Sequence, residues 1–313
     1  MPPSLLDSRL LDPRTLIARS RAGLAATVRD KIGGDSFSDT HEKIWFTPGA
    51  RWFTETDPIW VVHADAAMFI GGIRALLLQS LHPVAMLGVS EHSGFRSDPW
   101  GRLQRTSTYL ATTTYGTVAD AERSIRIVRA IHGRVTGTTP SGEPYRADDP
   151  HLLGWVHVAE VDSFVTAFQA FGSRRLTDAE VDTYVAQSGS VAERLGVVDP
   201  PQTWAENQEL LAAYRPELTS SPAARDVAHF LLREPPITGP AKLGYAALAA
   251  GAISLLPPWV RSTLLLPTLP ATDRLVVRPV VRSALATLRW ALADPTGMPH
   301  LVADEKGDGQ PRD

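Results

Sequence analysis

Apolar residues recur along this chain mainly at intervals of three and four, which is the spacing of one helix face. Alternating Val, Ile and Thr runs, which would indicate strands, are rare. Thr117, Thr177 and Thr203 mark helix starts, because each is followed three residues later by an acidic residue. The pattern predicts an all-α protein with helices at about 15–30, 59–81, 84–92, 99–115, 118–136, 151–171, 178–195, 204–215, 222–232, 241–255 and 272–293.

Composition changes along the chain predict its organisation. Residues 1–54 are interpreted as an N-terminal helical arm, and residues 55–296 as one large helical domain. Residues 297–313 are polar and charged, which predicts a disordered tail. The Pro-rich stretch 235–240 is the best candidate for an internal boundary, but the helices after it are too apolar to stand alone.

Two stretches, 66–88 and 243–259, are apolar enough to compare with membrane spans. The first is interrupted by Arg74 and His82, and the second ends at Pro257. A span needs roughly 18 or more uninterrupted apolar residues, so both are predicted to be buried helices. A membrane surface is the alternative location for the second. The N-terminus lacks the apolar segment of a secretory signal, which makes the cytoplasm the default location.

Composition also limits the chemistry. The 313 residues include no Cys, which excludes disulfides, zinc–thiolate sites, iron–sulfur clusters and a cysteine nucleophile. A net charge of -3 argues against nucleic acid as a partner. Any metal or haem must therefore be held by carboxylates or by the 9 histidines.

The fifth predicted helix carries a histidine on its apolar face, which consists of Ala121, Ile125, Val128, His132 and Val135. A buried imidazole must be hydrogen-bonded or ligated, so His132 is either a core residue bonded to a carbonyl or a ligand. One imidazole cannot hold zinc or non-haem iron alone. It can hold haem, because the porphyrin supplies four nitrogens.

The fourth predicted helix, 99–115, presents Arg102 and Thr106 one turn apart on one face, with Arg105 beside them. The short turn at Gly116 predicts that this helix runs antiparallel to the fifth. In the functional interpretation, Arg102 and Thr106 face a cavity and bind a propionate or an oxygen species. The alternative is a solvated helix side.

Other histidines offer a further candidate. A histidine–carboxylate metal cluster of His63, His82, His92 and His157 is conceivable, but no metal-binding motif has their spacing. A structural role is the better interpretation of each one separately. Gly-rich phosphate loops and Gly-x-Ser-x-Gly elbows are absent from the sequence. We interpret Gly71-Gly72 as a close-packing site within a helix.

Several segments resemble the MpaB-type oxygenase family, which includes the rubber oxygenases, in order and spacing. They are Gly71–Pro83, Gly88–Ser93, Asp98–Thr106, Ile131–Gly137, Tyr145–Pro150 and Trp155–His157. The resemblance covers roughly residues 55–235. It implies an all-α fold with a globin-like core and a b-type haem whose proximal ligand is His132.

The resemblance also assigns the distal side. The family order Arg-x-x-Lys-Thr is matched by Arg102-Leu-Gln-Arg105-Thr106. Lysine can act as a sixth ligand, whereas arginine stays protonated and cannot, so a lysine-closed distal side should be absent. Arg102, Arg105 and Thr106 are expected to orient dioxygen or peroxide by charge-assisted hydrogen bonds. Glu91 is a candidate proton-transfer base.

The expected function is therefore that of a haem-b-dependent oxygenase, which activates dioxygen and oxidises or cleaves an apolar isoprenoid or lipid-like substrate. Three alternatives remain open: a haem peroxidase or dehydrogenase, a non-catalytic haem carrier or gas sensor, and a structural helical protein without the cofactor. The sequence contains no signal for the oligomeric state.

Overall fold

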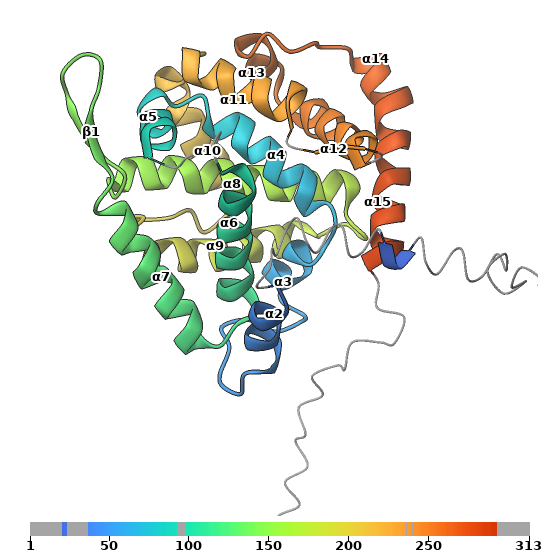
Figure 1. Ribbon diagram of the computed structural model, residues 1–313, viewed down its shortest axis with the longest axis horizontal. Coiled ribbons are helices and arrows are strands. Elements are labelled where there is room, and N and C mark those ends of the chain that lie inside the picture. Colours follow the sequence, from blue (N-terminus) through green and yellow to red (C-terminus); the bar gives the residue numbers. More distant parts are fainter. Residues whose placement is uncertain (1–20, 24–36, 93–97, 236, 240, 293–313) are drawn as a thin grey trace, which may run out of the picture.

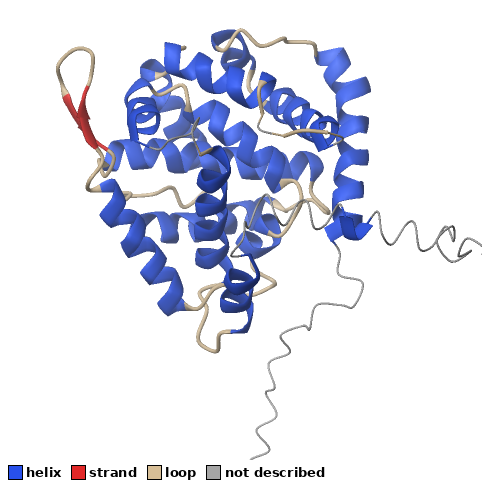
Figure 2. Ribbon diagram, in the orientation of Figure 1, coloured by secondary structure: helices blue, strands red, loops and turns tan. Residues whose placement is uncertain are grey.

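The computed structural model describes residues 21–23, 37–92, 98–235, 237–239 and 241–292 (Figure 1). This part of the chain is almost entirely helical, with one two-stranded antiparallel hairpin (Figure 2). The all-α prediction is confirmed. Most of the predicted helix at 15–30, and the predicted tail at 297–313, lie outside the described residues.

The elements follow the chain in this order: α2 (Phe37–Phe46), α3 (Pro58–His63), α4 (Met68–Gln79), α5 (Pro83–His92), α6 (Pro99–Tyr115), α7 (Val118–His132), β1 (Thr136–Thr138), β2 (Pro144–Arg146), α8 (Pro150–Phe171), α9 (Asp178–Leu195), α10 (Trp204–Tyr214), η2 (Arg215–Glu217), α11 (Pro222–Arg233), α12 (Ala241–Leu255), α13 (Pro258–Thr263), α14 (Pro270–Thr272), η3 (Asp273–Val277) and α15 (Arg278–Leu292).

The predicted helix caps at Thr117, Thr177 and Thr203 are confirmed. Each hydroxyl accepts a hydrogen bond from the backbone N–H three residues later, at 3.2, 3.3 and 3.2 Å respectively. Thr177 and Thr203 form complete capping boxes, in which the glutamate side chain three residues later accepts a hydrogen bond from the backbone N–H of the capping threonine. A cap of this kind stabilises a helix by about 1 kcal/mol. The start of each of these helices is therefore determined by residues within its own first turn.

The predicted helix at 59–81 is wrong, because it is two helices. α3 ends at His63, α4 begins at Met68, and Asp65 lies between them. The Asp65 carboxylate accepts hydrogen bonds from the N–H groups of Ala67 at 2.7 Å and Ser173 at 3.0 Å, and it forms an ion pair with Arg289 of α15 at 2.6 Å. Such local side-chain bonding competes with a continuous helix, and the periodicity of the apolar residues does not reveal it.

The boundary of α7 also differs from the prediction. The helix ends at His132 rather than at 136, so Val135 is not on its apolar face. The chain then forms the β1–β2 hairpin, which was not predicted and which projects from the body of the molecule (Figure 1). Gly137 pairs with Tyr145 there, and a Cβ at Gly137 would lie 2.6 Å from the tyrosine ring. The hairpin depends on a residue without a side chain.

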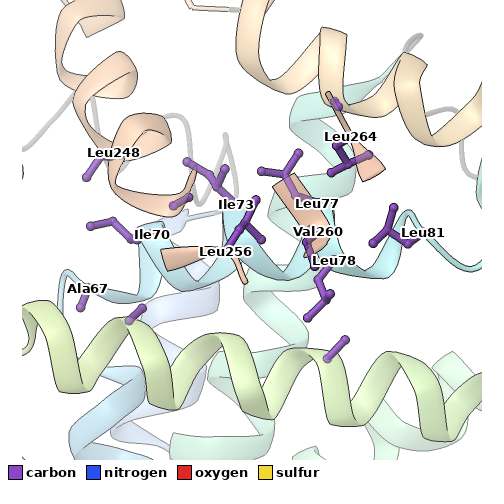
Figure 3. Close-up of a cluster of buried hydrophobic side chains, with 14 of the residues drawn as sticks. Ala67, Ile70, Ile73, Leu77, Leu78, Leu81, Leu248, Leu256, Val260 and Leu264 are labelled. Atoms are coloured by element: carbon purple, nitrogen blue, oxygen red, sulfur yellow. The ribbon is translucent and has the colours of Figure 1, made fainter. Parts of the chain in front are cut away.

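The core centres on α4 and α8, which pack side by side with α12 and α13 above α4 (Figure 3). A Cβ at Gly71 would lie 2.6 Å from the Phe164 ring, so the close-packing interpretation of Gly71 is confirmed. Gly72 has no such neighbour. The interior of α4 also contains Arg74, which is only 2% exposed and forms a 2.6 Å ion pair with Asp162 of α8.

Both apolar stretches belong to helices with buried faces. α4 is buried along most of its length, and α12 buries Leu248, Ala249, Gly251 and Ala252. Among the described residues, no single helix is long and apolar enough to cross a membrane, although α4 and α5 together, bent by 112° at their junction, have the length and composition of a span.

Candidate functional site

His132 is the last residue of α7, at the end of an apolar face that becomes gradually more exposed. Ala121 and Ile125 on this face are buried, whereas Val128 and His132 are half-buried. The Nδ1 atom of His132 is nevertheless buried and has no hydrogen-bond partner. Burial lowers the pKa of His132, and the nearby charge of Asp148 offsets part of this shift. The imidazole is therefore neutral at pH 7 with an unsatisfied nitrogen, the state that a metal ligand requires.

The carbonyl-bonded core histidine, the alternative interpretation of His132, is not supported at Nδ1, which makes no hydrogen bond among the described residues. An unpaired buried polar atom costs about 1–3 kcal/mol, so such atoms are uncommon in a core. This observation favours a ligand role over a purely structural one.

α6 and α7 are antiparallel neighbours, as predicted (Figure 1). The turn at Gly116 and Thr117 places the start of α6, with Arg102, at the same end of the pair as His132. Arg102 is half-buried, and its pKa is lowered first by burial and then by the charge of Arg105. A desolvated guanidinium of this kind gains strongly from an anionic ligand.

The other predicted distal residues occupy more solvated positions. Arg105 is 65% exposed and forms a 3.1 Å ion pair with Asp98, which also caps the start of α6 through the N–H of Gly101. Thr106 is exposed. Glu91 belongs to α5, but its side chain lies outside the described part of the chain. Of Arg102, Arg105 and Thr106, the three whose side chains the structure describes, Arg102 is the one removed from solvent.

Two residues of α8, His157 and Glu160, have strongly shifted pKa values. The sequence analysis considered His157 but not Glu160. His157 is buried, its Nε2 has no hydrogen-bond partner, and burial lowers its pKa to about 4. Glu160 lies one turn later, and burial raises the pKa of its carboxyl to about 7. Its charge also raises the pKa of Tyr109 on α6 and of Tyr184 on α9. A glutamate three residues after a histidine in a long apolar helix was the available sequence signal.

The metal cluster considered for His63, His82, His92 and His157 is not assembled by the described residues. His63 is bonded through one ring nitrogen to the hydroxyl of Thr114 at 2.8 Å, and through the other to Tyr184 at 3.1 Å. Burial lowers its pKa to about 3. Its structural interpretation is confirmed. The side chain of His92 lies outside the described residues.

His82 has different partners from those considered. It lies between α4 and α5, and its Nε2 is 3.3 Å from a carboxylate oxygen of Glu217. The same carboxylate binds the Nε2 of His151, at 2.8 Å. The three ligand atoms all lie within 4.8 Å of one another, which is the spacing of a metal-binding group.

Comparisons with known proteins agree with the resemblance. Residues 60–290 match the family model described as "ER-bound oxygenase mpaB/B'/Rubber oxygenase, catalytic domain". Searches of curated proteins and of solved structures found no match. The matched region includes both the His132 end of the α6–α7 pair and the α4–α8 core. The chain therefore belongs to the MpaB/rubber oxygenase catalytic-domain family, a family of oxygenases.

Proposed function

We propose that the protein is a haem-b-dependent oxygenase in which His132 is the proximal axial ligand. The observation that carries the proposal is the neutral imidazole of His132, which has a buried, unpartnered nitrogen at the same end of the α6–α7 pair as the desolvated Arg102. These residues fit haem because it needs only one axial nitrogen from the protein. When bound, haem supplies the iron at which dioxygen is activated.

The chain itself supplies orientation and charge. Arg102, half-buried beside the cationic Arg105, would bind a propionate or an oxygen species by charge-assisted hydrogen bonds. Arg105 is paired with Asp98, and a guanidinium, unlike a lysine amine, would not bind iron. The two arginines of this segment therefore have different roles. Arg102 would bind the ligand, whereas Arg105 binds Asp98 at the start of α6.

Proton handling is the second contribution of the chain. With a pKa of about 7, the Glu160 carboxyl is partly protonated at neutral pH, so it can both hold and accept a proton. Tyr109 stays protonated beside it because burial and the Glu160 charge raise its pKa. Glu91 remains the candidate base from the sequence, and Glu160 is a second candidate from α8.

We propose an apolar substrate, of the isoprenoid or lipid class, together with dioxygen and with no nucleic-acid partner. The support comes from the family and from exposed apolar side chains of these two helices, which are Leu103 of α6 and Ile127 and Ile131 of α7. Large exposed apolar side chains are suited to contacts with an apolar molecule or with a membrane surface. The cytoplasm remains the proposed location.

The test is the absorption spectrum of protein purified from haem-supplemented cells. We expect an intense Soret band with one haem per chain, and we expect His132→Ala to lose it. His229→Ala is the matched control, because His229 is an exposed histidine near a carboxylate, at 3.7 Å from Glu234. Full haem content and an unchanged spectrum in His132→Ala would show that the assignment is wrong.

Oxygen uptake distinguishes the catalytic alternatives. An oxygenase consumes dioxygen when an isoprenoid or lipid is added, and His132→Ala should abolish this consumption. A carrier or gas sensor binds ligands reversibly without consumption, and a peroxidase requires added peroxide. A haem-loaded protein that consumes no oxygen with any apolar substrate would contradict the oxygenase proposal while leaving the haem assignment intact.

A further inference from the structure

Three side chains of metal-ligating type converge at a place that the proposed haem function does not use. His82 lies between α4 and α5, His151 is the second residue of α8, and Glu217 ends η2. The His82 Nε2 is 3.3 Å from one Glu217 oxygen, and the His151 Nε2 is 2.8 and 3.0 Å from the two oxygens. Three segments that are far apart in the sequence thus present two imidazole nitrogens and a carboxylate to one point.

Bonds outside the cluster hold these segments in place. The N–H of Thr219, just after Glu217, donates to the carbonyl of Leu81, just before His82, at 2.9 Å. The Tyr214 hydroxyl donates to the backbone carbonyl of His151 at 2.7 Å. These bonds hold in place the backbone segments that carry the three ligands.

The buried member of the cluster gives an independent indication of a ligand. The His82 side chain is only 4% exposed, and its Nε2 forms no hydrogen bond although it lies 3.3 Å from the Glu217 carboxylate. Buried polar atoms without partners are rare and need an explanation. This nitrogen is aimed at the other two ligands, and an ion between them would satisfy it.

We propose that His82, His151 and Glu217 bind one divalent transition-metal ion, best matched by Zn²⁺, with water completing the coordination. Zinc bonds to imidazole and carboxylate of about 2.0–2.2 Å in a tetrahedron place neighbouring ligand atoms about 3.3 Å apart. The His82–Glu217 distance has this value, and the His151–Glu217 distance is shorter by about half an ångström. Imidazole donors select such ions over Mg²⁺ and Ca²⁺.

The surroundings permit both entry of the ion and the proton changes that binding requires. His151 and Glu217 are 54% and 42% exposed, so an ion and a water molecule can reach the site from solvent. Binding at the Nε2 atoms leaves the ring proton of His151 on Nδ1. It also places the His82 proton on Nδ1, which ends the long 3.4 Å contact from the N–H of Ala85. The ion would link the α4–α5 junction, the start of α8 and η2.

The test is metal binding by the full chain after chelator treatment. Calorimetric titration with Zn²⁺ should show one equivalent bound, native mass spectrometry should show one ion per chain, and Co²⁺ should give the visible spectrum of a tetrahedral site. Zn²⁺ should also raise the melting temperature. His151→Ala and Glu217→Gln alter the exposed ligands, and each should weaken binding at least tenfold.

Two matched variants keep the outcomes distinct. His229→Ala removes an exposed histidine near a single carboxylate and should bind Zn²⁺ as the unaltered chain does. His132→Ala should also keep its one equivalent of Zn²⁺ while losing haem, so the failure of either proposal is recognised separately. The metal site is refuted if the unaltered chain binds no stoichiometric Zn²⁺, or if Glu217→Gln binds it equally well.

Discussion

Arg74 in the α4–α8 pair and His132 at the end of the α6–α7 pair both carry polar groups away from water, but their surroundings differ. In α4–α8, Arg74 is bound by Asp162 at 2.6 Å, by the Ser163 hydroxyl at 2.8 Å and by a backbone carbonyl at 3.2 Å. At the end of α6–α7, His132 has a buried nitrogen without a partner, and at the same end burial lowers the pKa of Arg102.

This difference distinguishes polar groups that stabilise the fold from polar groups that are available to a ligand. A buried group with all its partners stabilises one arrangement of the helices, and removing a partner leaves an uncompensated charge. A buried group without partners reduces stability unless a ligand supplies what is missing. We therefore expect substitutions around Arg74 to act on folding and substitutions around His132 to act on ligand binding, and the measurements below test that division.

The largest effect is expected for Asp162→Ala. It leaves the Arg74 guanidinium, which is 2% exposed, without its carboxylate partner. Breaking a buried pair in this way costs about 3–5 kcal/mol of unfolding free energy. Urea denaturation measures the loss, and haem bound per folded chain should be unchanged at low temperature. The comparison fails if the variant is as stable as the unaltered chain, or if it folds fully and cannot bind haem.

A smaller effect is expected when the two arginines of α6 are replaced in turn. Arg102→Met should reduce oxygen uptake by about 10–100-fold, because it removes a desolvated cation that forms charge-assisted bonds of about 1.5–3 kcal/mol. Arg105→Met should change uptake less than threefold, since its exposed pair with Asp98 is worth about 0–1 kcal/mol. Equal losses in the two variants would contradict the distinction between them.

The pH dependence of stability in Glu160→Gln tests whether burial raises the pKa of the Glu160 carboxyl. The folded pKa of about 7 lies above the ordinary 4.5, so the folded chain binds the proton more tightly than the unfolded chain. The stabilisation of the folded chain by protonated Glu160 is therefore fully present below pH 4.5 and is lost as the pH rises through 7. Relative to Glu160→Gln, the unaltered chain should lose about 3 kcal/mol of unfolding free energy across this window, because each pKa unit is worth about 1.4 kcal/mol.

Denaturation of both chains between pH 4 and pH 8 measures this loss. Glu122→Gln is the control, because Glu122 is exposed on α7 and its ion pair with Arg126 is 3.9 Å long. A difference between the Glu160→Gln and unaltered chains that does not vary with pH would show that the Glu160 carboxyl is not desolvated.

The smallest effect is expected for the haem-free form of His132→Ala. The ring is half-buried and its Nδ1 is unpaired, so its removal should change the unfolding free energy by less than about 1 kcal/mol. Chemical denaturation of the haem-free proteins measures this. A loss of 3 kcal/mol or more would place His132 with Arg74 as a structural residue and would remove the contrast between the two helix pairs.

Local signals predicted most of the fold. The caps at Thr177 and Thr203 act within one turn, so the sequence displays them directly. The break between α3 and α4 was not predictable in this way, because the Asp65–Arg289 ion pair joins residues that are 224 positions apart. The β1–β2 hairpin was missed because its strands are only three residues long.

The same reasoning explains what could be predicted of the sites. His132 could be proposed from the sequence because haem needs one protein nitrogen, which a single residue on a periodic face can supply, and its role as a ligand stays a prediction. The cluster of His82, His151 and Glu217 was not, because its geometry exists only after three distant segments meet. The family assignment is confirmed, while the roles of Arg102, Arg105, Thr106 and Glu91 stay predictions.

The ion pair between Arg105 and Asp98 bears on how an external ligand would reach the proposed haem. A lysine at this position could alternate between binding the iron and releasing it, so only part of the population would accept a ligand at any moment. Arg105 is paired at the start of α6 and, as a guanidinium, would not bind iron, which leaves no internal competitor at this position. The apparent affinity for a small distal ligand would then equal the intrinsic affinity, and its binding would proceed in one kinetic phase without a preceding isomerisation.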